Sequence, residues 1–516
     1  MSSRYLFDAV FVVAAGLSAG IGCTELPGAD DTVATDDTGT DQQSLGLNDR
    51  IATCSADPRV VAGAVSVDVC VGADLFFRET FNGNGRSCAS CHRVDNNFTI
   101  DPAFIAKLPA RDPLFVAEFV PALAGLEIPA QMRRFGLILE NVDGFAPDPR
   151  THFVLRSVPH TLSLATSVTR APGDTVNPPI ERTGWSGDGA PGAGALRDFQ
   201  TGAITQHYTR SLGRVAGTDF RLADAGELDR ILAFQRQIGR TNELALASVV
   251  MSDARAEAGR TRFLSVGCNA CHGNAGANAS FGGGGNRNFN TGVESSRNPA
   301  LAAFPHDGGF QTTPANPDGS FGNGTFNTPP VIEAADTGPF FHTATSVTGA
   351  SAHNTDTATT IEEAIAFYDS PAFNNSPSGR VAPIDLTADE IDNIGRFLRG
   401  VNATFNAALA IKRLDAAAAV AVRFHNAHLD TQRELLRLAN VEVGDAIKVL
   451  AGVPNLDVES VISLIAARVL VDQARATGSE FQRALDIILA RGLVSLASTK
   501  VGTNLTYQIG DGTVMF

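Results

Sequence analysis

Hydrophobic residues recur at helical spacing in two distant parts of the chain, and both stretches begin with the same start signal. Asp224 and Glu227 form a capping-box pair ahead of the first stretch, and Thr387 and Glu390 form such a pair ahead of the second. The pattern therefore predicts two amphipathic helices, each starting at its capping box. After the second stretch, helical spacing continues among many alanines, which predicts a helical accessory region over 402–516.

A different apolar pattern stands at the N-terminus. Arg4 is followed by an apolar run over 6–21, which is typical of an export signal and too short to span a membrane comfortably. We expect a signal peptide over 1–23. The Asp-, Thr- and Gly-rich residues that follow lack apolar periodicity, so we expect an acidic, flexible tether over 24–48.

Cys23, at the end of the apolar run, follows small residues and resembles the acylation site of bacterial lipoproteins. Gly20 stands where such sites usually have Leu or Val. The sequence predicts a protein of the bacterial periplasm or cell envelope that is held to the membrane only through a lipid on Cys23. Simple signal cleavage without lipidation is the alternative.

The two predicted helices each close a longer repeat that contains the main chemical signal of the chain. Two copies of Cys-x-x-Cys-His use four of the seven cysteines: Cys88-Ala-Ser-Cys91-His92 and Cys268-Asn-Ala-Cys271-His272. Two thiols at this spacing can attach to the vinyl groups of one porphyrin, and the following His can bind its iron. A zinc ribbon would need a gap of about 15–20 residues, whereas Cys91 and Cys268 lie 177 positions apart. The motifs predict two covalently bound haem c groups.

The repeat also predicts the fold class. Each haem motif follows a short apolar segment and precedes, after a loop-rich stretch, one of the capped helices. We expect a mainly α fold with two cytochrome c-type haem domains in tandem, over about 50–240 and 255–401, with long loops and the C-terminal helical extension. A chain of 516 residues that is 44% hydrophobic is large enough for more than one domain.

Charge and the remaining cysteines add two expectations. A formal net charge of -15 speaks against a nucleic-acid partner, since phosphate binding needs a basic face. It is compatible with a basic redox partner. Export also permits a disulfide between Cys54 and Cys70, which would close a short loop before the first haem motif.

The order of motifs over residues 65–401 resembles the di-haem cytochrome c peroxidase and MauG superfamily. The matching segments are Gly72-Ala-Asp-Leu-Phe-Phe, Gly85-Arg-Ser-Cys-Ala-Ser-Cys-His, Arg156-Ser-Val-Pro-His-Thr-Leu, Gly184-Trp-Ser-Gly-Asp-Gly-Ala, Thr328-Pro-Pro-Val-Ile, Gly338-Pro-Phe-Phe-His and Ile361-Glu-Glu-Ala-Ile-Ala-Phe-Tyr. The resemblance implies that the first haem meets peroxide in an open distal pocket, while the second stores or relays electrons. It also implies that Trp185, the only Trp, lies between the haems as an oxidisable bridge; the alternative is an ordinary, partly buried aromatic residue.

The second haem departs from the family's peroxidases, which use Met as its sixth ligand. No Met lies between His272 and the end of the second predicted domain, and the corresponding position holds Tyr368. MauG-type enzymes resemble this arrangement, and a phenolate ligand favours ferric iron. Tyr368 could instead be buried only for packing. The main rival ligand is His342, whose place in the resemblance is beside a haem propionate.

The first haem departs further, because the family's distal Glu is missing. Residues 186–211 contain no Glu and offer Phe199, Gln200, Gln206 and His207. His207 could act as the distal acid and base, bind the iron and close the site, or make no haem contact. Rubber oxygenases, remote members of the superfamily, have an apolar distal pocket with a Phe and bind dioxygen, so Phe199 keeps an oxygenase hypothesis open.

The resemblance also implies a calcium ion between the domains, near a Thr-x-Pro segment. Thr328 and Pro330 match this segment, but Ser157 stands where the family has Asn. Calcium is therefore the weaker of the two cofactor predictions.

We expect an oxidoreductase that reacts with hydrogen peroxide at the haem of His92 and exchanges electrons through Trp185 with the haem of His272. The electron source would be a small cytochrome c or cupredoxin, or an oxidisable organic or protein substrate. The alternatives are a non-enzymatic di-haem electron carrier with both irons six-coordinate and a rubber-oxygenase-like dioxygenase.

Overall fold

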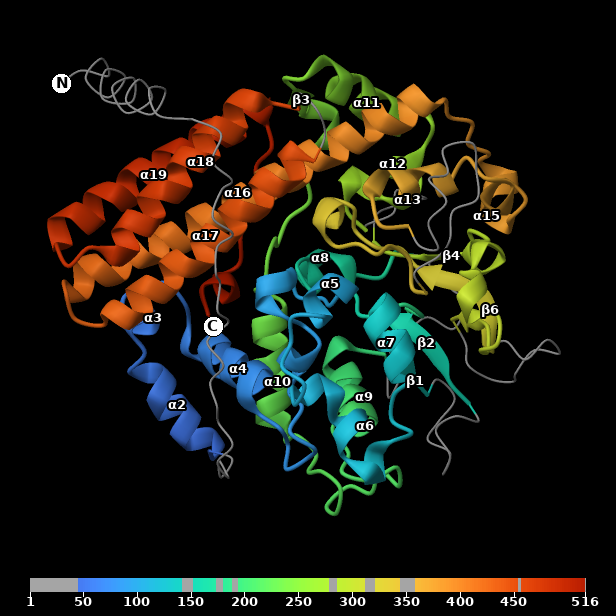
Figure 1. The fold of residues 1–516 in the computed structure, drawn as a ribbon, viewed down its shortest axis with the longest axis horizontal. Helices are drawn as coiled ribbons and strands as arrows, with labels where there is room; N and C mark the ends of the chain where they lie inside the picture. The colour runs from blue at the N-terminus through green and yellow to red at the C-terminus, as the bar shows by residue number, and fades with distance from the viewer. Residues whose placement is uncertain are drawn as a thin grey trace. The chain divides into compact units, whose positions relative to one another are not determined.

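The computed structural model describes residues 45–141, 152–172, 180–187, 194–277, 285–310, 321–343, 358–452 and 456–515. Residues 46–516 form one compact unit. The predicted signal peptide, Cys23 and all but the last few residues of the predicted tether lie outside the described residues. The described chain is mainly helical with few strands, which confirms the predicted fold class at this level (Figure 1).

Two helix crossings position the two haem motifs. In the first, α4 (Val67–Arg78), which precedes Cys88, packs against α10 (Ala225–Gln235). The helices approach so closely at Gly72 that a Cβ there would lie 1.9 Å from the carbonyl oxygen of Arg230. Only glycine fits such a crossing.

The second crossing repeats the first. Here α11 (Ala254–Ser265), which precedes Cys268, packs against α16 (Ala388–Phe424). A Cβ on Gly259 would lie 1.8 Å from the carbonyl oxygen of Asn393. The same pairing of an entry helix with a closing helix therefore occurs once for each motif (Figure 1).

Both closing helices begin where the sequence predicts. Asp224 and Glu227 form a capping box at the start of α10, and Thr387 and Glu390 form another at the start of α16. Each pair satisfies backbone donors that have no partner inside the helix. However, α16 is 37 residues long, so the boundary predicted between 401 and 402 falls inside one continuous helix.

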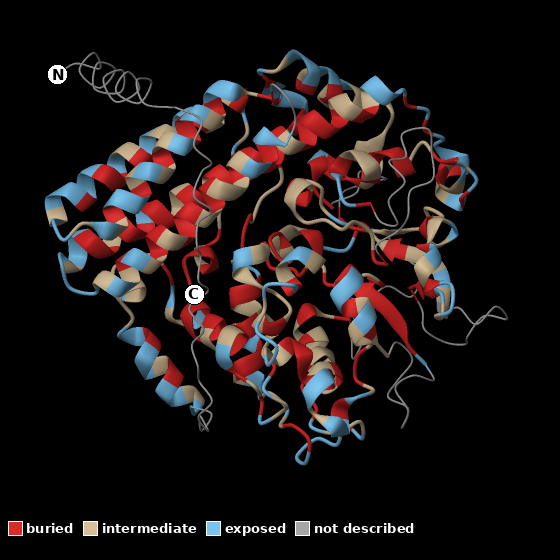
Figure 2. Ribbon diagram, viewed as in Figure 1, coloured by how far each residue is buried: buried red, intermediate tan, exposed pale blue. Residues whose placement is uncertain are grey.

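The predicted accessory region is helical. The second half of α16 packs with α17 (Leu429–Ala451), α18 (Val458–Ala476) and α19 (Glu480–Val501), and each helix contacts its two neighbours in the resulting four-helix bundle. A continuous hydrophobic core runs from the two helix crossings into this bundle (Figure 2). None of the helices in the described ranges is long and apolar enough to cross a membrane.

The strands are short and form three small sheets. The pair β1 (Leu137–Glu140) and β2 (Val154–Ser157) is antiparallel, as is the pair β3 (Val250–Met251) and β7 (Gly502–Thr503). A third sheet has the order β4 (Asn288–Phe289), β6 (Phe321–Asn327) and β5 (Asp307–Gly309).

Of the other α-helices, α9 is as long as α4 and α11, and the rest have nine residues or fewer. They are α2 (Leu47–Ser55), α3 (Pro58–Val61), α5 (Pro102–Ile105), α6 (Val116–Phe119), α7 (Pro129–Phe135), α8 (Leu164–Ser167), α9 (Leu196–His207), α12 (Cys268–Cys271), α13 (Ile361–Phe367), α14 (Pro371–Asn374) and α15 (Pro377–Val381).

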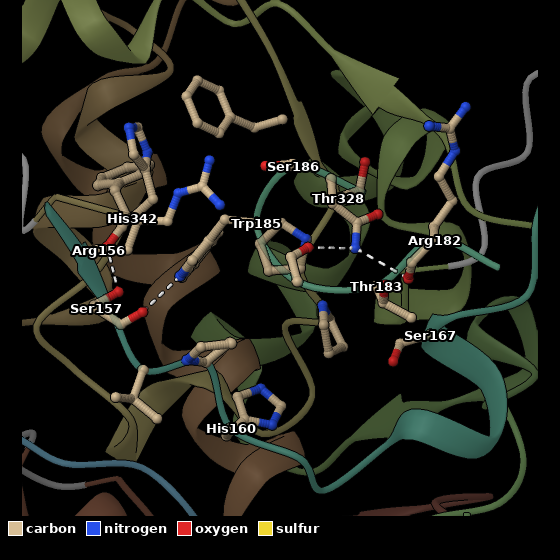
Figure 3. A pocket seen from close by; sticks show the side chains of 18 of the residues that line it. Arg156, Ser157, His160, Ser167, Arg182, Thr183, Trp185, Ser186, Thr328 and His342 are labelled. Atoms are coloured by element: carbon tan, nitrogen blue, oxygen red, sulfur yellow. Dashed lines mark hydrogen bonds between the residues drawn. The ribbon is translucent and has the colours of Figure 1, made fainter. Parts of the chain in front are cut away.

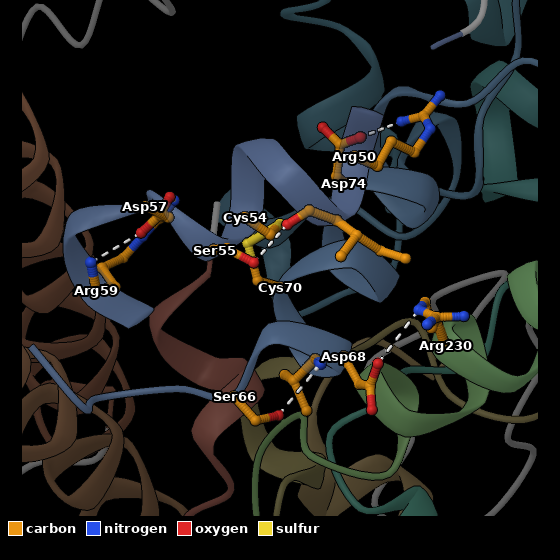
Figure 4. The surroundings of a disulfide bond; sticks show 12 residues. Arg50, Cys54, Ser55, Asp57, Arg59, Ser66, Asp68, Cys70, Asp74 and Arg230 are labelled. Atoms are coloured by element: carbon orange, nitrogen blue, oxygen red, sulfur yellow. Dashed lines mark hydrogen bonds and ion pairs between the residues drawn. A yellow bond between two sulfur atoms is a disulfide. The ribbon is translucent and has the colours of Figure 1, made fainter. Parts of the chain in front are cut away.

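The predicted disulfide is present. Cys54 of α2 and Cys70 of α4 are bonded, with their Cα atoms 5.8 Å apart (Figure 4). The bond fixes α2 to the entry helix of the first motif. Beside it, Arg50 of α2 pairs with Asp74 and Glu79, so α2 is held both covalently and by buried charges.

Candidate functional site: one cavity lined by both haem motifs

One cavity of about 1270 Å³ is lined by the four Cys and two His residues of the two haem motifs. Single small-molecule sites usually measure about 300–1,000 Å³, so this volume suits more than one ligand or one very large one. Residues from both helix crossings and from the small sheets complete its wall. Figure 3 shows the part of a pocket around Trp185.

The first motif is fixed from several sides. Cys88 begins a short 3-10 helix after Ser87, and the Nδ1 of His92 hydrogen-bonds to the carbonyl oxygen of Phe98 at 2.9 Å. This contact makes Nδ1 the protonated nitrogen and leaves Nε2 as the nitrogen able to bind a metal. Burial lowers the pKa of His92, so the ring is neutral, as a metal ligand must be.

The second motif repeats this arrangement. The Nδ1 of His272 hydrogen-bonds to the carbonyl oxygen of Pro329 at 2.9 Å, and burial lowers its pKa to about 4. Cys268 and Cys271 are the first and last residues of the one-turn helix α12, which ends directly before His272. Both His residues thus have the orienting carbonyl contact that metal-binding His side chains usually have.

The four motif cysteines are free thiols. Burial raises the pKa of Cys88, Cys91 and Cys271 to about 11 and that of Cys268 to about 12. They are therefore neutral and available for thioether bonds. Within the described ranges, no group of three or more His, Cys, Asp and Glu side chains is arranged to hold a metal ion.

A buried ion pair anchors the first motif. Arg86, two residues before Cys88, donates to Glu127 Oε1 at 2.8 Å and to the carbonyl oxygen of Leu114 at 2.7 Å. The other oxygen of Glu127 accepts from the backbone N–H of Leu139 in β1. Both charged side chains are almost completely buried, so each depends on the other.

Trp185 forms hydrogen bonds with two of the strands that line the cavity, β2 and β6. Its Nε1 donates to the carbonyl oxygen of Ser157 in β2 at 2.8 Å, and its own carbonyl oxygen accepts from the backbone N–H of Asn327 in β6. The ring centroids of Trp185 and His342 are 6.2 Å apart (Figure 3). The indole of Trp185 is thus held in the wall of the cavity, between β2 and β6.

Of the two candidate ligands for the second iron, Tyr368 is the one whose ring contacts His272. The two rings are perpendicular, with centroids 6.5 Å apart. Burial, with the nearby Cys271 and Cys268, raises the pKa of Tyr368. His342 is engaged elsewhere, since its Nε2 contacts Glu294 Oε1 at 2.7 Å and its ring stacks on Phe326.

The four candidates for the distal side of the first site lie on α9 and line the cavity. Phe199 lies against Gly184, beside Trp185. Gln200 is buried and hydrogen-bonds to Gln235 of α10. Gln206 accepts from the backbone N–H of Asn141, so its carbonyl oxygen is engaged in the wall.

His207 is the distal candidate with an unused nitrogen. Its Nδ1 is buried and has no hydrogen-bond partner among the residues that the structure describes. Burial and the charges of Arg86, Arg214 and His92 hold its pKa well below the usual value, so the ring is neutral. A neutral, unpaired imidazole nitrogen is able to accept a proton.

Two residues of the site were missed by sequence reasoning. Tyr208 donates from its hydroxyl to Cys88 Sγ at 3.1 Å. His160 lines the cavity, and burial together with the charges of Arg240 and His92 lowers its pKa to about 4. His160 lies in the segment 156–162, and Tyr208 directly follows His207 in the range 186–211. Both segments carry part of the resemblance, and this was the one sequence signal for either residue.

Thr328 and Pro330, the predicted calcium segment, flank the carbonyl that orients His272. Thr328 Oγ1 donates to the carbonyl oxygen of Arg287, and the Thr328 carbonyl accepts from Asn286. Ser157 Oγ donates to the carbonyl oxygen of Phe341. The hydrogen bonds of Thr328 therefore hold the segment whose Pro329 carbonyl orients His272.

No family model, curated protein or solved structure matches this chain.

Proposed function

We propose that this protein is a di-haem c-type oxidoreductase that reacts with hydrogen peroxide at the first site and exchanges electrons through the second. The observation that carries the proposal is that two Cys-x-x-Cys-His motifs, 177 positions apart in the sequence, line one cavity. In both motifs the His uses Nδ1 for a backbone carbonyl and keeps Nε2 for iron.

The residues present fit two haem c groups. Cys88 and Cys91 would attach the first and Cys268 and Cys271 the second, with the following His of each motif as an axial ligand. When bound, the haems supply the iron centres for peroxide cleavage and one-electron transfer. Tyr368 would be the second axial ligand at the second site.

The proton chemistry falls to side chains of the first site. Reduction of one hydrogen peroxide takes two electrons and two protons and releases two water molecules. Nδ1 of His207 can take the proton from one peroxide oxygen and return it to the leaving oxygen. The charge of Arg214, a buried side chain, lowers the pKa of His207, so the ring is neutral before it takes the proton and returns that proton readily.

Trp185 would be the oxidisable side chain between the two binding regions. Its Nε1 hydrogen bond to Ser157 holds the ring in one orientation. The electrons would come from a small cytochrome c or cupredoxin, or from an organic or protein substrate. The disulfide is typical of an exported protein and supports a location in the bacterial periplasm or cell envelope, with Cys23 as the lipid anchor.

Stopped-flow spectroscopy of the haem-loaded protein mixed with hydrogen peroxide tests the proposal. We expect a rapid change in the haem absorbance of the wild type. His207→Gln should slow it roughly 10²–10⁴-fold, the usual contribution of a positioned acid and base. His425→Gln is the matched control, because His425 is 73% exposed in the helical bundle. No spectral change in the wild type would overturn the proposal.

Phe199 favours a second candidate, a dioxygenase with an apolar distal pocket. Its ring lines the cavity beside Gly184, and α9 carries no Glu. Anaerobic mixing with peroxide, compared with mixing with dioxygen, separates the two functions. A purely electron-carrying protein would have both irons six-coordinate and would show no high-spin ferric signal in electron paramagnetic resonance.

A further inference from the structure

The outer helices of the bundle carry apolar side chains on the side away from its core. On α18, Val458, Ile462, Ile465 and Val469 are 43–59% exposed. They are spaced four, three and four positions apart, so they form one stripe along the helix. This is the spacing of residues that pack helix against helix.

The neighbouring helix has a matching stripe. On α19, Phe481, Leu485, Ile488 and Leu496 are 38–78% exposed. The two helices run antiparallel in contact, since Ser460 of α18 donates to the carbonyl oxygen of Ala497 of α19. The exposed faces of both helices lie on the surface of the bundle (Figure 2).

Both helices are also apolar on the side that faces the core. Leu464, Ala467 and Val471 of α18 and Ile487 and Val494 of α19 are completely or almost completely buried. The face of a surface helix opposite the core usually carries mainly polar residues, whereas here it also carries a stripe of large apolar ones. The two exposed stripes are therefore better explained by a further partner than by solvent.

The exposed area fits a protein interface. The eight side chains of the two stripes are 38–78% exposed and together expose on the order of 600 Å², taking about 150 Å², the lower end for a large side chain, for each. The largest apolar patch of a typical monomer is about 300–600 Å². A stable interface buries about 800 Å² on each partner, much of it apolar at the centre.

Gly492 points to close packing against that partner. It lies in the middle of α19 on the exposed side, between Ile488 and Leu496. A Cβ at this position would meet no atom of the described residues within 4 Å. Glycine inside a helix costs about 1 kcal/mol relative to alanine, and no described neighbour requires it here. The missing side chain of Gly492 leaves a notch between Ile488 and Leu496, and this notch can accept a side chain from the partner.

Charge favours a second copy of this chain as the partner. The whole chain carries -15, so most surfaces of two copies repel each other. Residues 458–501 contain five Arg and Lys and four Asp and Glu, a net charge of +1. Two copies can therefore approach at these helices without repulsion, whereas an anionic membrane surface would favour a clearly basic rim.

We propose that α18 and α19 form the interface of a homodimer, with the stripe of one copy packed into the notch at Gly492 of the other. A two-fold axis makes such a surface self-complementary. This inference concerns assembly and is independent of the proposed haem chemistry.

Sedimentation velocity of the full haem-loaded chain, over a range of concentrations, tests the proposal. We expect a dimer for the wild type and a monomer for Ile462→Glu/Ile488→Glu. Ile180→Glu is the matched control, because Ile180 is 60% exposed and lies outside the bundle; it should remain dimeric. Unchanged circular dichroism and haem spectra show that each variant is folded.

Gly492→Leu distinguishes close packing at Gly492 from non-specific hydrophobic association of the exposed stripes. It adds apolar surface but fills the notch, so it should raise the dimer dissociation constant about ten-fold or more, equivalent to about 1.4 kcal/mol. A stronger dimer in this variant would overturn the proposed geometry. A monomeric wild type would overturn the proposal, as would a monomer that binds phosphatidylcholine vesicles through Ile462 and Ile488.

Discussion

Glu127→Gln tests whether the buried ion pair with Arg86 anchors the first haem motif. The carboxylate is fully buried and accepts from both Arg86 and the backbone N–H of Leu139. Glutamine keeps the shape and one acceptor oxygen but leaves the guanidinium charge of Arg86 unpaired. Removing one partner of a buried pair costs about 3–5 kcal/mol.

The size of the folded unit sets the expected change in melting temperature. Residues 46–516 form one unit of 471 residues. At about 2.1 cal/mol/K per residue, its unfolding entropy is about 1 kcal/mol/K, so the melting temperature should fall by about 3–5 °C. Differential scanning calorimetry measures this change.

Glu118→Gln is the matched control. Glu118 pairs with Arg133 on the surface, where the two side chains are 29% and 42% exposed. Exposed pairs contribute about 0.2–1 kcal/mol, so the control should lose no more than about 1 °C. Equal losses in the two variants would refute the reasoning that burial makes the pair with Arg86 essential.

The remaining predictions concern pH, potential and electron exchange. Burial raises the pKa of Glu442 to about 7 and, together with the charges of Asp336 and Glu442, raises that of Asp445. The folded state therefore holds protons that the unfolded state has already released, so stability should fall as pH rises from about 4.5 to 7, by up to about 3 kcal/mol for Glu442. Asp445→Asn should make the fall in melting temperature shallower, and an unchanged slope would contradict this. Tyr368→Phe should raise the reduction potential of the second haem and leave covalent haem content unchanged, because the ligand that favours ferric iron is lost; a redox titration with an unchanged potential would mean that Tyr368 only packs. Trp185→Phe should slow the response of the second haem to peroxide in stopped-flow spectra, while equal rates would remove Trp185 from the electron path.

Local signals predicted the elements that local interactions determine. The capping boxes at Asp224 and Thr387 specify their helix starts because the partners lie three residues apart. The disulfide followed from counting cysteines, since Cys54 and Cys70 alone remained near each other in sequence. The helical character of the accessory region followed from apolar spacing among strong helix formers, whereas its four-helix packing did not.

The rest depends on contacts between distant segments. The pair β1 and β2 has only four residues in each strand, too few for a clear alternating pattern. Helix α16 continues past residue 401 because its second half packs into the bundle, and no proline stops it. Tyr208 meets Cys88 only through the fold, 120 positions away in the sequence, so no local spacing could reveal it.

The covalent haem content of each motif tests the central claim most directly. Mass spectrometry of the denatured chain should show the polypeptide plus two haem groups. Cys88→Ala/Cys91→Ala should retain one haem, on the peptide that contains Cys268 and Cys271, and the reciprocal double variant should retain the other. A chain that carries no covalent haem, or that binds zinc through these four cysteines, would contradict the account.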